Sequence, residues 1–209
     1  IGSLNRKYFY DANSSFFIDE ENSNFSLRKT PFISLINNLE SNSIRLENVL
    51  KIKDGIDTGN NNLYVSNEYK NGWKKLIGGS DIDRWKVKTH RYVNYGKHLA
   101  NPRNPSLFEN NKIIIRETGN RIIATVDENS HYALSTLYSG FIIDERFTLK
   151  SILGLLNSEI AQFLMILMAF GRTKGAFTKT RIFHYYSIPV DSKISQFTKL
   201  IDVLVECLL

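Results

Sequence analysis

Three short stretches of the chain combine glycine with side chains that bind nucleic acids. The first, 54–62, reads Asp-Gly-Ile-Asp-Thr-Gly-Asn-Asn-Asn, and the others are 116–121 and 171–181. An asparagine amide can bond adenine at two points, and an arginine guanidinium can bond guanine at two points. Lysine and arginine neutralise phosphates, and threonine hydroxyls bond phosphate oxygens. These stretches are therefore candidates for an interface with double-stranded DNA.

The candidate DNA-binding residues lie in these stretches or directly beside them. They are Lys51, Lys53, Thr58, Asn60, Asn61, Asn62, Arg116, Thr118, Asn120, Arg121, Arg172, Thr173, Lys174, Lys179 and Arg181. Each residue alone is typical of a solvated protein surface. Their recurrence on loops that follow strands favours a shared task.

Residues typical of other chemistries are absent or wrongly spaced. The four histidines are scattered and the single cysteine, Cys207, lies in an apolar segment, whereas zinc sites need closely spaced ligand pairs. The sequence has no Gly-x-Ser-x-Gly motif, no Gly-Lys-Ser/Thr phosphate loop and no Asn-Pro-Pro-Tyr methyltransferase motif. We therefore expect no catalytic residue and no metal site.

Asp81, Asp83 and Lys86 supply one alternative. Two carboxylates near a lysine loosely match the site of a metal-dependent nuclease. The preceding Gly78 and Gly79 favour a structural turn instead. A small nuclease is kept as an alternative function.

The composition is that of a folded, moderately basic protein. The chain has 209 residues, a net charge of +6 and a hydrophobic fraction of 42%, which suits polyanionic partners. A single cysteine excludes a disulfide framework and fits a reducing cytoplasm. No signal peptide is visible, and the longest apolar run, 163–170, is shorter than the about 20 residues that span a bilayer. We expect a cytoplasmic protein that makes no membrane contact.

The sequence pattern predicts an α+β fold, with a mixed, strongly twisted β-sheet core, flanking helices and a C-terminal amphipathic helix. Helical spacing of apolar residues predicts helices at 31–39 and 149–170. A basic loop and a β-like segment that ends at 188–190 follow the second helix. The predicted strands are 49–53, 63–65, 73–77, 85–87, 91–95, 112–116, 122–126, 132–135 and 138–143, with 112–126 as a hairpin.

We expect three parts along the chain. Residues 1–45 form an N-terminal arm and helix, and because the chain begins without methionine we expect it to be one domain of a larger protein. Residues 46–191 form the main domain, and 192–209 form the amphipathic helix. Its apolar residues follow coiled-coil spacing: Ile194, Phe197, Ile201, Leu204 and Leu208. This stripe either packs on the domain or pairs with another subunit, so an oligomer or a protein-interaction module is a further alternative.

Five motifs occur in an order and spacing that resemble a known family. They are Lys53–Asn61, Leu76–Trp85, Lys112–Gly119, Gly154–Ser158 and Ile182–Val190. Over 46–209 the chain resembles the TaqI-like C-terminal specificity domain. This is the target recognition domain of DNA adenine methyltransferases and of fused type II restriction–modification enzymes, and it is similar to the recognition domains of type I specificity subunits.

The resemblance implies that residues 46–191 are a DNA target recognition domain, which reads a duplex sequence while an upstream methyltransferase domain of the same chain flips and methylates an adenine. Residues 1–45 then form the arm and helix that join the two domains. S-adenosylmethionine is then expected in that upstream domain, and no cofactor is expected in the present chain. The resemblance assigns no base contact to an individual residue.

Overall fold

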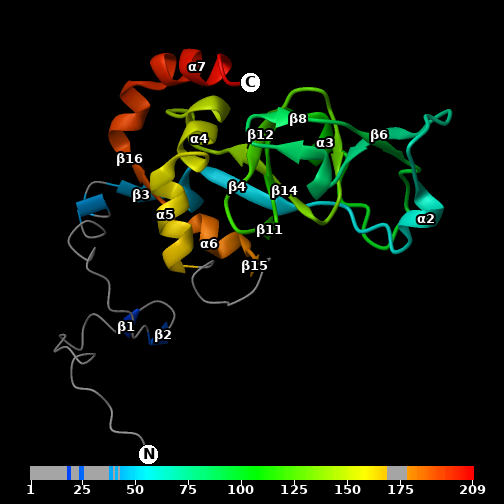
Figure 1. Ribbon diagram of the computed structural model, residues 1–209, viewed down its shortest axis with the longest axis horizontal. Coiled ribbons are helices and arrows are strands. Elements are labelled where there is room, and N and C mark those ends of the chain that lie inside the picture. The colour runs from blue at the N-terminus through cyan, green and yellow to red at the C-terminus, as the bar shows by residue number, and fades with distance from the viewer. Residues whose placement is uncertain (1–17, 20–23, 26–37, 40, 42, 169–177) are drawn as a thin grey trace, which may run out of the picture. The chain divides into compact units, whose positions relative to one another are not determined.

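The computed structural model describes residues 18–19, 24–25, 38–39, 41, 43–168 and 178–209 (Figure 1). The contacts within the chain divide it into two units, Ile1–Ser41 and Asn42–Leu209. In the first unit, β1 (Ile18–Asp19) pairs antiparallel with β2 (Asn24–Phe25). The helix predicted at 31–39 lies mostly outside the described residues.

A four-stranded antiparallel sheet forms the centre of the second unit, in the order β12-β10-β14-β4. Its strands are β4 (Leu50–Asp54), β10 (Lys112–Arg116), β12 (Ala124–Asp127) and β14 (Leu137–Ile142). The isoleucine run of β10 is buried on both faces, as continuous β-branched runs in inner strands are. The hairpin predicted over 112–126 is confirmed, because Ile114 pairs with Thr125.

The two faces of this sheet bury two different hydrophobic cores. Successive side chains of a strand point to opposite faces. Accordingly, Ile113 and Ile115 pack with the helices of the unit, among them the buried Ile152 and Leu156. Ile114 packs into the other core, with residues of a second sheet. Figure 1 shows the helices of residues 149–168 and 182–186 on one side of the central strands, and on the other side the strand of residues 74–77 from the second sheet with two short helices.

The second sheet is mixed and has the order β13-β6-β9-β5. The parallel pair is β13 with β6, and the other pairs are antiparallel. The strands are β5 (Val65–Ser66), β6 (Lys74–Ile77), β9 (Arg91–Val93) and β13 (Tyr132–Ala133). The predicted α+β class with mixed sheets is confirmed, and its strands are divided between these two main sheets.

Several short elements complete the unit. The two-stranded ribbons join β3 (Ser43–Arg45) with β16 (Pro189–Asp191), β7 (Ile82–Asp83) with β8 (Lys86–Val87), and β11 (Thr118–Gly119) with β15 (Thr178–Lys179). The short helices are η3 (Leu46–Asn48), η4 (Gly79–Asp81) and α3 (Ser106–Glu109). The strand predicted at 63–65 is wrong at its start, since α2 (Asn61–Tyr64) occupies it. The Asn60 side chain caps this helix by accepting a hydrogen bond from Leu63 N at 3.3 Å.

The helix predicted at 149–170 is two helices, α4 (Leu149–Leu156) and α5 (Glu159–Met168). The Asn157 amide donates to Ala124 O at 3.0 Å, and the Ser158 hydroxyl accepts from Ala161 N at 3.1 Å. Such side-chain bonds to the backbone compete with the helix and start a new one. Among the described residues no single helix is long and apolar enough to cross a membrane. Helices α4 and α5 have the required length and apolar composition only when they are taken together, and the chain bends by 54° between them.

The β-like segment predicted up to 188–190 is wrong in its middle, where α6 (Ile182–Tyr186) forms. The aromatic run Phe-His-Tyr-Tyr has strand propensity. Tertiary packing overrides that propensity, because Tyr185 is fully buried against the central sheet. Arg181 N donates to His184 Nδ1 at 3.0 Å at the start of this helix.

The C-terminal segment forms η6 (Ser192–Gln196) and α7 (Thr198–Glu206). Methyl groups of Ile201 and Val205 approach α4 where Gly154 has no side chain. The predicted apolar stripe is therefore split. Ile194 and Ile201 pack against the core, whereas Phe197, Leu204 and Leu208 are exposed. Pairing of this helix with another subunit stays a prediction.

The split of the stripe predicts different effects for neighbouring residues. We expect Val205→Ala to lower the free energy of unfolding by about 1–2 kcal/mol, because two buried methyl groups are lost. Leu204→Ala removes an exposed side chain, so we expect it to change the free energy of unfolding by less than about 0.5 kcal/mol. Urea unfolding measures both values, and equal values would show that α7 does not dock as described.

Candidate nucleic-acid interface

A polar groove of about 380 Å³ lies where the two sheets meet. Its lining combines two arginines, small hydroxyl residues and glycines: Asn61, Gly78, Gly79, Ser80, Arg91, Arg116, Thr118, Leu134 and Thr136. A smaller hollow of about 130 Å³ adjoins it and shares Asn61, Leu134 and Thr136 with it. The arrangement offers hydrogen-bond donors and positive charge to an anionic ligand.

The 54–62 stretch is held firmly beside the groove. Beyond β4, Ile56 N donates to Ala133 O at 2.7 Å, and Asp57 and Asn101 exchange backbone bonds of 3.0 and 2.8 Å. The Thr58 hydroxyl donates to Asn61 Oδ1 at 2.6 Å, and Thr58 is buried. Thr58 therefore orders the loop, while Asn61 faces the groove.

The 116–121 and 178–181 segments are joined beside the groove. In the β11–β15 ribbon Thr118 is opposite Lys179, and both the amide and the hydroxyl of Thr180 donate to Glu117 O, at 2.8 and 2.7 Å. The Tyr138 hydroxyl lies 2.9 Å from Thr180 O and 3.0 Å from Glu117 Oε1. Two distant segments thus form one rigid support.

Buried phenols complete this support. The Tyr185 hydroxyl lies 3.0 Å from Thr180 Oγ1 and donates to Arg116 O at 3.2 Å. Burial raises the pKa of both Tyr138 and Tyr185 well above its usual value. Both hydroxyls therefore stay protonated and keep donating at any pH where the fold is used.

The structure brings some of the predicted residues to the groove and leaves others around it. Asn61, Arg116 and Thr118 line it, and Lys179 is next to Thr118 but paired with Glu117 at 2.9 Å. Thr58 is buried and lines the smaller hollow. The remaining described candidates are exposed and lie outside the lining: Lys51, Lys53, Asn60, Asn62, Asn120, Arg121 and Arg181. Arg172, Thr173 and Lys174 lie outside the described residues.

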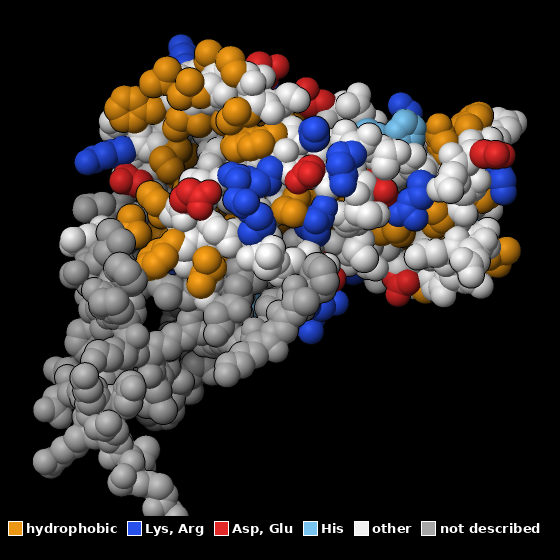
Figure 2. All heavy atoms as spheres, viewed as in Figure 1, with side chains coloured by type: hydrophobic (Ala, Val, Ile, Leu, Met, Phe, Trp, Pro, Cys, Tyr) orange, Lys and Arg blue, Asp and Glu red, His pale blue; other side chains and the backbone are white. Residues whose placement is uncertain are grey.

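Basic side chains recur across the middle of the face shown in Figure 2. Lys51 and Lys53 belong to one face of β4, because alternate residues of that strand are exposed. Arg121 is exposed and lies 3.6 Å from Glu159 across an ion pair that water screens strongly. These groups can reach a polyanion without a large change of the fold.

Arg91 and the Gly78–Ser80 turn are groove residues that the sequence reading did not select. Arg91 lies within a predicted strand, and the two glycines predict a structural turn. The only sequence signal was the pair of glycines directly before Ser80, which permits a close approach of other groups to the backbone.

The nuclease alternative gains no support from the site. Oδ2 of Asp81 accepts hydrogen bonds from Gly78 N at 2.8 Å and from Arg91 Nη2 at 2.9 Å, so this carboxylate is already used. Asp83 is exposed on the β7–β8 ribbon, opposite Lys86. Within the described part of the chain, no group of three histidine, cysteine or acidic residues is placed to hold a metal ion.

Residues 74–190 match the model of the TaqI-like C-terminal specificity domain. The chain belongs to this family. The match covers more than half of the chain and includes the groove residues from Gly78 to Thr136. No curated protein matches the chain. The family consists of specificity domains of restriction–modification enzymes, which confirms the resemblance stated from the five motifs.

Proposed function

We propose that this chain reads a specific sequence in double-stranded DNA as the non-catalytic target recognition domain of a restriction–modification enzyme. One observation carries the proposal. Segments 54–62 and 116–121 are far apart in the sequence, yet Asn61, Arg116 and Thr118 line one groove, and segment 178–181 is paired with Thr118 through Lys179. Family membership supports the same reading.

The proposal gives different tasks to different residues. Lys51, Lys53 and Arg181 are exposed cations and neutralise phosphates, which fixes the register of the duplex. Asn61 and Thr118 in the groove bond base edges, where sequence is read. Separating the two tasks is typical of proteins that bind DNA specifically.

Catalysis belongs to another domain in this proposal. A methyltransferase domain of the same protein, upstream of the present chain, binds S-adenosylmethionine and methylates an adenine. The present chain then supplies position and sequence specificity, and we expect it to cleave no DNA by itself.

A salt series tests the proposal. We expect the chain to bind a labelled random duplex at about 50 mM salt and to lose affinity steeply towards about 200 mM, because bound phosphates release counterions. Replacing Lys51 and Lys53 by glutamine should weaken binding and reduce the slope of log K against log salt by about 2, roughly one per phosphate contact. Fluorescence anisotropy measures both quantities.

The matched control removes the same charge elsewhere. Lys193 and Lys199 are exposed on η6 and α7, and their double glutamine variant should keep the parent slope. Absent binding at low salt, or a slope that is lowered equally by both double variants, would contradict the proposed interface.

A further inference from the structure

Arg91 enters the groove from β9 and is held by a buried carboxylate. Oδ2 of Asp81 accepts from Arg91 Nε at 3.2 Å and from Nη2 at 2.9 Å. The Asp81 side chain is 8% exposed, and that of Arg91 is 28% exposed. A bond to two nitrogens of one guanidinium fixes the plane of that group and not only its position.

The bonds to Asp81 leave the outer edge of the guanidinium free. Arginine has five N–H donors, and Asp81 takes one from Nε and one from Nη2. The Nη1 donors and the second Nη2 donor have no hydrogen-bond partner among the described residues. Two parallel N–H groups on one edge match the O6 and N7 acceptors of guanine in the major groove.

Gly78 lets the guanidinium take this position. A Cβ atom at residue 78 would lie 2.7 Å from Arg91 Nη2, closer than a carbon and a nitrogen can approach. The backbone there is extended, with φ −126° and ψ −177°, so any residue could adopt it. Glycine is needed at this position for space and not for conformation. Gly78 N also donates to the same Asp81 oxygen at 2.8 Å.

The other arginine of the groove is arranged differently. Nη2 of Arg116 donates to Ile82 O, and its Nε is buried without a partner among the described residues. A neutral carbonyl holds one end of this side chain inside the protein. Arg116 thus forms the wall of the groove, whereas Arg91 presents a charged, oriented fork to the ligand.

We propose that Arg91 is a specificity-determining residue that reads a guanine through Nη1 and Nη2, with Asp81 and Gly78 as its positioning residues. This inference rests on the proposed function and adds a base identity to it. Because Asp81 orders the fork before DNA arrives, binding loses little side-chain freedom. A flexible, fully exposed arginine would instead suit a phosphate contact.

A binding selection from a randomised duplex library tests the inference. We expect the parent chain to select sites with a required guanine. Arg91→Lys keeps the charge and loses the fork, so the preference for that guanine should fall roughly 5- to 150-fold, the range for one bidentate base contact. The affinity for random duplex and its salt slope should stay unchanged.

Two further variants separate reading from structure. Gly78→Ala keeps Arg91 but pushes its guanidinium away from Asp81, so the preference for the same guanine should fall more than the affinity for random duplex, while the melting temperature should stay above the temperature of the binding assay. Arg146→Lys is the matched control, because Arg146 is also held by an aspartate, Asp144 at 2.6 Å, on an exposed loop outside the groove. It should leave every base preference unchanged.

The experiments distinguish a failure of the proposed function from a failure of the guanine assignment to Arg91. A parent chain that binds no duplex at low salt overturns the proposed function itself. A parent that binds with a sequence preference lacking guanine, or an Arg91→Lys variant that keeps every preference, overturns the guanine assignment alone. A uniform loss of affinity with a reduced salt slope and every base preference kept in Arg91→Gln, which removes the charge, would make Arg91 a phosphate contact and would also overturn it.

Discussion

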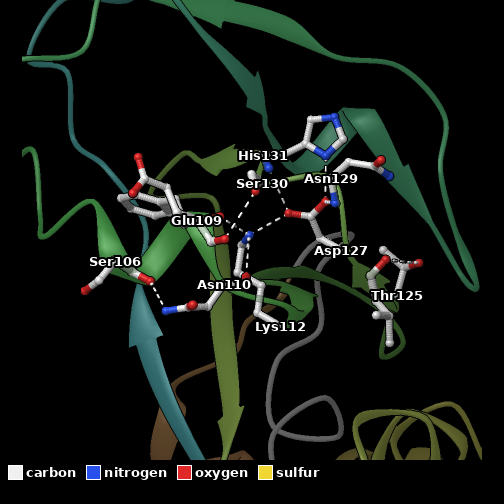
Figure 3. Close-up of polar contacts among 11 residues, drawn as sticks. Ser106, Glu109, Asn110, Lys112, Thr125, Asp127, Asn129, Ser130 and His131 are labelled. Carbon is white, nitrogen blue, oxygen red and sulfur yellow. Dashed lines mark hydrogen bonds and ion pairs between the residues drawn. The ribbon is translucent and has the colours of Figure 1, made fainter.

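Replacing Asp127 by alanine is expected to lower the free energy of unfolding by about 3–5 kcal/mol, because it leaves a buried ammonium group without its counterion. Lys112 and Asp127 are fully buried, and Nζ of Lys112 lies 2.5 Å from Oδ2 of Asp127. Figure 3 shows the carboxylate of Asp127 between Lys112 and His131. Urea unfolding at neutral pH measures the loss.

The contacts around Asp127 explain why this loss exceeds that of an ordinary ion pair. Its carboxylate accepts from His131 Nδ1 at 2.7 Å, and from the backbone amides of Asn129 and His131 at 3.0 and 2.9 Å. Burial lowers the pKa of Lys112, and Asp127 opposes that shift. The Lys112 Nζ also donates to Phe108 O at 2.6 Å, so several oxygen acceptors favour its charged form. The substitution therefore breaks a network and not a single pair.

Two further variants show whether the buried charge causes the loss. Glu128→Ala removes the exposed neighbouring carboxylate and should change stability by less than about 0.5 kcal/mol. The double variant Lys112→Met, Asp127→Leu removes both charges and should recover much of the loss, since a hydrophobic pair avoids burying an unpaired charge. A loss in Asp127→Ala no larger than in Glu128→Ala would refute this account.

The same network predicts a pH dependence at the acid end. Burial alone would raise the pKa of Asp127, but the His131 hydrogen bond and the Lys112 ammonium outweigh it and lower the pKa to about 2. The unfolded chain has an aspartate pKa of about 3.9, so the folded state binds this proton more weakly. The stabilisation is complete above about pH 4 and is lost as the pH falls through 2. The parent should lose more stability over this range than Asp127→Ala.

The strands that could be predicted from the sequence are those whose own residues decide their structure. The β-branched run of β10 and its return in β12 have few alternatives, and the hairpin that they predict is confirmed, although β12 begins two residues later than predicted. The run Ile182–Tyr186 shows the limit, because its aromatic residues favour a strand while burial of Tyr185 against the central sheet selects a helix. Propensity decides only where packing does not.

The groove could be predicted only in part, because pairings between distant segments create it. Residue types identify Asn61, Arg116 and Thr118 as candidate DNA-binding residues. Neither segment, however, has a sequence pattern that predicts the pairing of Thr118 with Lys179. The sequence also does not show in which direction a side chain points. Thr58 has the chemistry of a phosphate ligand, yet its hydroxyl points into its own loop. A strand pattern likewise does not show that Arg91 lies above a glycine.

Replacing Gly55 by alanine is expected to have the largest effect of any small substitution near the groove. A Cβ atom there would lie 2.2 Å from Leu134 O and 2.4 Å from Ala133 O, which are backbone atoms. We expect a loss of about 3 kcal/mol or more in the free energy of unfolding. Duplex binding should fall as well, because 54–62 must move away from the groove. Urea unfolding and fluorescence anisotropy measure the two losses.

The backbone bonds on both sides explain why the clash cannot relax. Ile56 N donates to Ala133 O at 2.7 Å and Ser135 N donates to Ile56 O at 2.8 Å, so separating the two segments breaks both bonds. Gly72→Ala is the matched control, because an added Cβ there meets no atom within 4 Å and only the positive φ of 79° opposes it. That strain costs about 1 kcal/mol and should leave duplex binding intact. Equal losses in the two variants would mean that contact between residues 55 and 134 does not position the 54–62 stretch at the groove.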